Sequence, residues 1–109
     1  MKKSNKTNGN RSHKHDFPDE EIWNTANTLA RLIAPRLRAF AAIDKHGIPV
    51  GFADMRQWNS AIQRMADAFE LMSTVRSLTA DEETAVKTGL DLFCKYYRNL
   101  CVCSEKVWN

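Results

Sequence analysis

The sequence predicts an all-α protein, a small antiparallel three-helix bundle behind a basic N-terminal tail. Three segments of the chain carry apolar residues at spacings of three and four, which is the helical period. No segment alternates apolar and polar residues as a half-buried strand does. The 109 residues are enough for one hydrophobic core. Three such helices must bury their apolar stripes against one another, which favours a bundle.

Residues 1–18 are expected to form a disordered basic tail, and residues 19–109 a single helical domain. After Met1 the first fifteen residues contain no aliphatic side chain, so they cannot offset the entropy lost on ordering. They hold no acid and five cations, which are Lys2, Lys3, Lys6, Arg11 and Lys14. Removing these five charges from the net charge of +3 leaves −2 for the rest of the chain. Specific DNA binding by the domain is therefore not expected.

The first helix is predicted over residues 20–43. Asp19, Glu20 and Glu21 suit its first turn, where the helix dipole favours negative charge. Pro35 removes a backbone donor and clashes with the preceding turn, so the helix is expected to kink or split there. The predicted core stripe consists of Ile22, Ala26, Leu29, Ala30, Ile33, Leu37, Phe40 and Ala41.

The second helix is predicted over residues 55–74, after a loop in which Gly47 is free to adopt positive φ. Asp54 and Gln57 have the spacing of a capping box. The apolar stripe that follows comprises Met55, Trp58, Ile62, Met65, Phe69 and Met72. We interpret this stripe as core, with a subunit interface through Met55, Trp58, Met65 and Met72 as the alternative.

The third helix is predicted over residues 80–101. Thr79 and Glu82 form a second capping-box pattern at its start. Gly89 lowers helix propensity by about 1 kcal/mol against alanine, so we expect another helix to pass close to it. The stripe on this helix consists of Val86, Leu90, Phe93, Cys94, Tyr97, Leu100 and Cys101.

Catalytic and metal-binding motifs are not found in the sequence. There is no glycine-rich phosphate loop, nucleophile elbow or HExxH motif. Cys94, Cys101 and Cys103 lack the paired spacing of a zinc site, and Cys94 is interpreted as a small core residue. No apolar stretch approaches the roughly 20 residues that span a bilayer. We therefore expect a cytoplasmic, non-enzymatic protein without cofactor, metal or membrane contact.

Basic and aromatic side chains of the first and third helices suggest an anion or nucleotide site. Arginine holds phosphate through two parallel hydrogen bonds, and tyrosine can stack on a base. The alternative interpretation is solvated helix faces with local ion pairs. The candidate ligand-binding residues are Arg31, Arg36, His46, Lys95, Tyr97 and Arg98.

Three blocks of the sequence resemble small proteins of unassigned function that tailed bacteriophages encode. The blocks are Trp23 with residues 28–37 and 47–49, then residues 58–70, and residues 89–100. This resemblance implies a phage origin, action in the cytoplasm of the infected host, and no catalytic residues to carry over. Small phage proteins of this kind often blunt host defence by binding a defence protein or by sequestering its nucleotide signal.

The function expected from the sequence is thus that of a phage accessory protein that acts by binding, as an antagonist of host defence. A nucleotide second messenger or a host defence protein is the expected partner. Two alternatives remain open, a homo-oligomeric interaction module without a small-molecule ligand and a weak nucleic-acid-binding protein that uses the basic tail.

Overall fold

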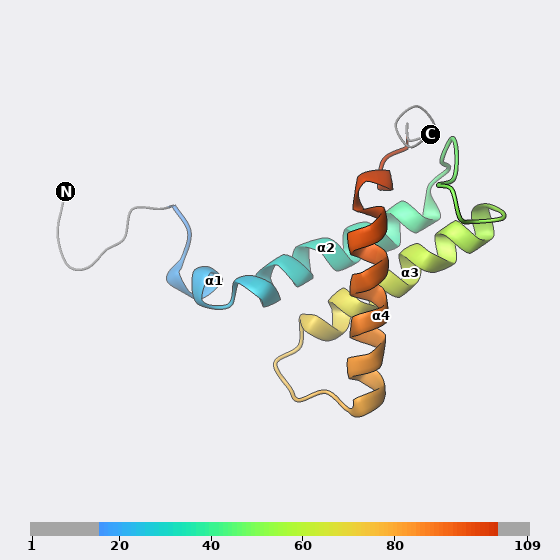
Figure 1. Cartoon of the computed structure of the whole chain (residues 1–109). Coiled ribbons are helices and arrows are strands. Elements are labelled where there is room, and N and C mark those ends of the chain that lie inside the picture. The colour runs from blue at the N-terminus through green and yellow to red at the C-terminus, as the bar shows by residue number, and fades with distance from the viewer. Residues whose placement is uncertain (1–15, 103–109) are drawn as a thin grey trace.

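The computed structural model describes residues 16–102, and within that range the chain is all-helical, as predicted (Figure 1). Residues 1–15 and 103–109 lie outside it, so the predicted tail and the domain boundary at residue 18 remain predictions. None of the described helices is both long and apolar enough to cross a bilayer. The elements are α1 (Asp19–Trp23), α2 (Thr25–Ala42), α3 (Met55–Met72), α4 (Ala80–Tyr96) and a 3-10 turn, η1 (Tyr97–Asn99).

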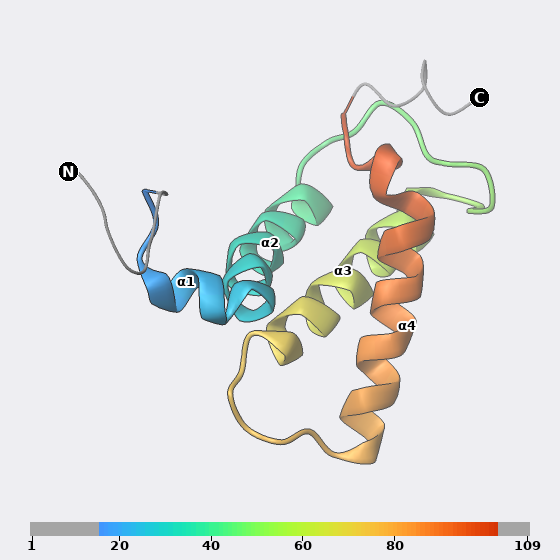
Figure 2. The ribbon, with the colours of Figure 1, turned by 60° about the vertical axis from the view of Figure 1, so that its left-hand side comes forward.

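Helix α3 is the centre of the fold. It packs against both α2 and α4, which lie on different sides of it (Figure 2). Because two helices cover α3, its buried residues spread over a wide arc of its surface. These residues are Trp58, Ala61, Ile62, Met65, Ala66, Ala68 and Phe69. The α2 and α4 stripes therefore meet α3 in the core.

The first predicted helix is interrupted at Asn24, whereas α2 continues through Pro35. The hydroxyl of Thr25 donates to the carbonyl of Ile22 at 2.6 Å, and such side-chain bonds compete with the helical ladder. Near Pro35, the Arg36 guanidinium donates to the Leu32 carbonyl at 2.8 Å. This bond lies next to the carbonyl that proline leaves without a backbone donor.

The core stripe of α2 differs from the predicted one. The structure buries Ala30, Ala34, Leu37 and Ala41 against α3. Ile22 and Leu29, which were predicted to be core residues, are about half exposed. The first helix is apolar over more than one side, so the period alone could not identify the side that faces α3.

Both predicted helix caps form, one of them with a different partner. Asp54 accepts the backbone N–H of Gln57, but the Gln57 side chain accepts from Ala53 and does not return to Asp54. Thr79 and Glu82 make both bonds of the capping box at the start of α4. The prediction for the first loop was wrong in detail, since Gly51 has the positive φ, at 110°, and Gly47 does not.

Candidate functional site

The structure does not bring the six candidate ligand-binding residues into one site. Arg31 and Arg36 are exposed on α2, where each bonds within its own helix, to Thr28 and Leu32. Lys95 lies over the ring of the neighbouring Tyr96, with 5.4 Å between Nζ and the ring centroid.

Tyr97 and Arg98 are exposed in η1, and the Tyr97 ring packs on Phe93. His46 follows α2, and its backbone N–H donates to the carbonyl of Val102 at 3.4 Å, so His46 lies near the segment after η1. Helix α3 stands between α2 and α4. Within residues 16–102 no hydrogen bond or ring contact joins any two of the six candidate residues.

The second candidate set, the stripe on α3, lies in the core of one chain. Trp58 and Met65 have no exposed surface. Met55 and Met72 are partly buried and pack against the same core. These four residues therefore do not form an exposed stripe that a partner could contact.

The cysteines are arranged differently from the prediction. Cys94 was interpreted as a core residue, but its side chain and that of Cys101 are exposed free thiols. Leu90 and Phe93, on the same helix, take the contacts with the core. No group of three or more potential metal ligands is formed among residues 16–102, and Cys103 lies outside them.

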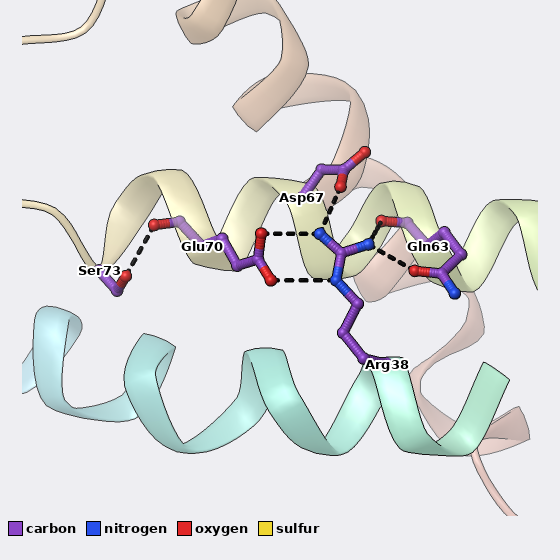
Figure 3. A network of polar contacts seen from close by, with 5 residues as sticks. All are labelled: Arg38, Gln63, Asp67, Glu70 and Ser73. Atoms are coloured by element: carbon purple, nitrogen blue, oxygen red, sulfur yellow. Dashed lines mark hydrogen bonds and ion pairs between the residues drawn. The ribbon is translucent and has the colours of Figure 1, made fainter. Parts of the chain in front are cut away.

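A polar network that sequence reasoning missed joins α2 to α3 (Figure 3). The Arg38 guanidinium donates to both carboxylate oxygens of Glu70, at 2.7 and 3.0 Å, and to Asp67 at 2.6 Å. It also donates to the side chain and the backbone carbonyl of Gln63. With these partners Arg38 has no donor left for an external anion. The network is therefore structural.

This network also shifts the pKa values of Arg38 and Glu70. Hydrogen bonding to Arg38 holds the pKa of Glu70 below its ordinary value, against the opposing effect of burial. The same bonds to Glu70 and Asp67 raise the pKa of Arg38 above its ordinary value. All three side chains are at least one-third exposed, so water and salt weaken their attraction.

Two further side chains stabilise helix ends. Asn27 of α2 donates to the carbonyls of Met72 and Thr74 at the end of α3, at 2.8 and 3.2 Å. The Lys45 ammonium donates to the carbonyls of Phe40 and Ile43 at the end of α2, at 2.7 and 2.9 Å. A cation suits that end of a helix. Burial lowers the pKa of Lys45.

Replacing Arg38 with methionine is expected to reduce the free energy of unfolding by about 1 kcal/mol at neutral pH. The folded pKa of Glu70 is depressed, so its contribution is complete above its ordinary pKa of about 4.3. That contribution is lost as the pH falls through the folded value. Urea denaturation of both proteins should therefore show a difference at pH 7 that shrinks below about pH 4.

The matched control for this experiment is Arg56→Met. Arg56 is exposed on α3 and has no hydrogen bond or ion pair within the described residues. Its replacement should change stability by less than about 0.5 kcal/mol. Equal losses from the two variants at pH 7 would show that the contact between α2 and α3 through Arg38 contributes nothing.

Exposed apolar side chains lie on the side of α2 that faces away from α3. We define the α2 seam as Leu29, Leu32, Arg36, Ala39 and Ile43, the last directly after the helix. All five residues are exposed, and the three large apolar ones, Leu29, Leu32 and Ile43, have 50%, 49% and 48% of their surface accessible. Trp23 and Ile22 of α1 are exposed as well.

The fold and these contacts define a small all-helical protein with a polar clamp between α2 and α3 and an uncovered apolar seam on α2. In comparisons with known proteins, no family model, curated protein or solved structure matches this chain.

Proposed function

We propose that this protein is a non-catalytic interaction module that binds another polypeptide through the α2 seam. The observation that carries the proposal is the half exposure of Leu29, Leu32 and Ile43 along one side of a helix whose other side is buried. Contiguous exposed apolar surface is typical of protein–protein contacts. A helix can present such anchors to a partner at spacings of three and four.

The biological role that we propose comes from the resemblance to phage proteins. In this role the chain is a phage accessory protein that acts in the cytoplasm of the infected host and antagonises a host defence protein. A rigid helical surface is sufficient for it, because the role needs no chemistry. Nucleotide sequestration is not proposed, since Arg31 and Arg36 each bond within α2.

The finer features of the predicted fold belong to the same proposal. A partner helix packed on the α2 seam would give α2 neighbours on two sides and complete a closed bundle. A bend at Pro35 would adjust the course of the seam along that partner. The basic tail over residues 1–18 keeps the chain soluble before it is bound.

Native mass spectrometry of the full chain, purified under native conditions, tests the proposal. The wild-type protein is expected to carry a second polypeptide, and the variant Leu29→Glu/Leu32→Glu is expected to have lost it. The control is Val75→Glu, because Val75 is 96% exposed in the loop between α3 and α4 and is not part of the α2 seam. A wild-type protein that is a bare single chain would refute the proposal.

A further inference from the structure

We infer that the polypeptide bound at the α2 seam is a second copy of this chain, paired antiparallel along α2. This inference rests on the proposed function, since it names the partner of the same surface. It follows from the spacing of the seam residues, from the sides of α2 that remain uncovered, and from the distribution of charge along α1 and α2.

The spacing of the α2 seam is that of a two-helix contact. From Leu29 to Ile43 its members follow one another at intervals of three, four, three and four residues. This is the heptad spacing of a and d positions, at which one helix packs its side chains between those of another. The seam extends from the second turn of α2 to the residue after its end, so it can pair with a helix of similar length.

Helix α2 therefore has two sides suited to helix packing, and only one of them is covered. Ala30, Ala34, Leu37 and Ala41 occupy one side and are buried against α3. The α2 seam lies on another side and is exposed. A second helix on the seam would bury the leucines and Ile43, with a gain of about 25 cal/mol for each Å² of apolar surface removed from water.

Charge along α1 and α2 favours a second copy as the occupant. Glu20 and Glu21 are exposed at the N-terminal end, and within residues 16–102 their carboxylates accept no hydrogen bond and form no ion pair. Arg36 lies farther along, in the middle of the α2 seam. Its guanidinium bonds one carbonyl of its own helix and keeps most of its five N–H groups for other acceptors.

Antiparallel pairing brings these opposite charges together twice, because a two-fold axis repeats every contact. In the register that sets Leu29 against the partner's Leu32, Arg36 lies beside the partner's Thr25 at the start of α2, and Ala39 and Ile43 extend beyond it to the partner's α1. Arg36 is then directed toward the partner's Glu20 and Glu21. A parallel pair, or an antiparallel pair centred on Arg36, would place the two Arg36 side chains against each other, and like charges at a contact are unfavourable. Each copy thus carries the complement of its own surface.

Sedimentation equilibrium of the full chain over a wide range of concentration tests the inference. The wild-type protein is expected to reach twice its chain mass of 12.5 kDa. Leu29→Glu/Leu32→Glu is expected to remain a single chain with an unchanged helical circular dichroism spectrum, and Val75→Glu to form the dimer. If the double variant loses helix, Leu32→Gln replaces it, and the same weakening is expected.

Charge reversal tests the orientation of the pair. Arg36→Glu alone and Glu20→Arg/Glu21→Arg alone should each raise the dissociation constant at least about tenfold. The combined variant should recover most of the affinity, because reversed charges again face opposite charges. Two weakened variants whose combination is weaker still would overturn the antiparallel arrangement.

The outcomes of these two measurements distinguish this inference from the proposed function. A wild-type protein that is a single chain in sedimentation, yet carries a different polypeptide in native mass spectrometry, would overturn the inference and leave the function standing. A protein that is a bare single chain in both measurements would overturn both. A dimer that is unaffected by Leu29→Glu/Leu32→Glu would also overturn the inference.

Discussion

Replacing Trp58 with alanine is expected to lower the free energy of unfolding by about 3–5 kcal/mol, because it leaves a large cavity in the core. The Trp58 side chain has no exposed surface, and its ring packs on those of Phe52 and Tyr96, with centroids 5.2 and 5.7 Å away. A small domain has a total stability of roughly 5–15 kcal/mol. The variant should therefore be largely unfolded well below the wild-type melting temperature.

Urea denaturation followed by circular dichroism measures this loss. The matched control is Trp23→Ala, since Trp23 is 75% exposed. Measured at a protein concentration low enough to avoid association, the control should change stability by less than about 0.5 kcal/mol. Equal shifts of the two denaturation midpoints would contradict the central position of Trp58.

The large loss of stability expected for Trp58→Ala arises because three segments of the chain pack together at this side chain. Its own position is in the first turns of α3, Phe52 belongs to the preceding loop, and Tyr96 is the last residue of α4. The Phe52 and Tyr96 rings also contact each other, with centroids 5.0 Å apart. One side chain therefore holds the loop and the end of α4 against α3.

The helical class, the position of each helix and the packing at Gly89 could be predicted from the sequence. These features depend on local physics, such as the helical period, the Thr79–Glu82 capping box, and the cost of glycine inside a helix. The helix boundaries were correct within a few residues, except that the chain is interrupted at Asn24 and α4 ends at Tyr96.

The pairing of elements could not be predicted in the same way. Arg38 is one of several cations on the first helix, and only the relative placement of α2 and α3 selects it for Glu70 and Asp67. The residues of the candidate nucleotide site are kept apart for the same reason. That site required cations of α2 and α4 to converge, and α3 lies between those helices.

The α2 seam was hidden by the composition of the first helix. Leu29 was placed in the core because it fits the helical spacing, and so does the buried Ala30 beside it. Two apolar sides on one helix merge into a single broad pattern in the sequence. A helix with two such sides indicates contacts with two neighbours, but the sequence does not say which neighbour belongs to the same chain.

At Gly89, substitution by alanine sets the gain in helix propensity against a steric clash with α3. In an exposed helix, alanine in place of glycine stabilises by about 1 kcal/mol. At Gly89, however, an added Cβ would lie 2.4 Å from the Ala68 Cβ and 2.6 Å from the Arg64 carbonyl oxygen. The Arg64 oxygen is backbone of α3, so relief requires the two helices to move apart.

We expect the steric clash to outweigh the gain in helix propensity. Gly89→Ala should lower the free energy of unfolding by about 1–2 kcal/mol, and Gly89→Leu should lower it by about 3 kcal/mol or more. The matched control is Thr88→Leu, because Thr88 is the neighbouring residue and is exposed. That variant should stay within about 0.5 kcal/mol of the wild type in urea denaturation.

The double variant Gly89→Ala/Ala68→Gly locates the origin of the effect. It removes the contact between the two Cβ atoms and keeps the one with the Arg64 carbonyl, so it should recover only part of the loss after correction for Ala68→Gly alone. The sign of the change in the free energy of unfolding for Gly89→Ala shows which effect is larger. A variant more stable than the wild type would mean that helix propensity prevails and that α4 does not approach α3 as closely as the structure has it.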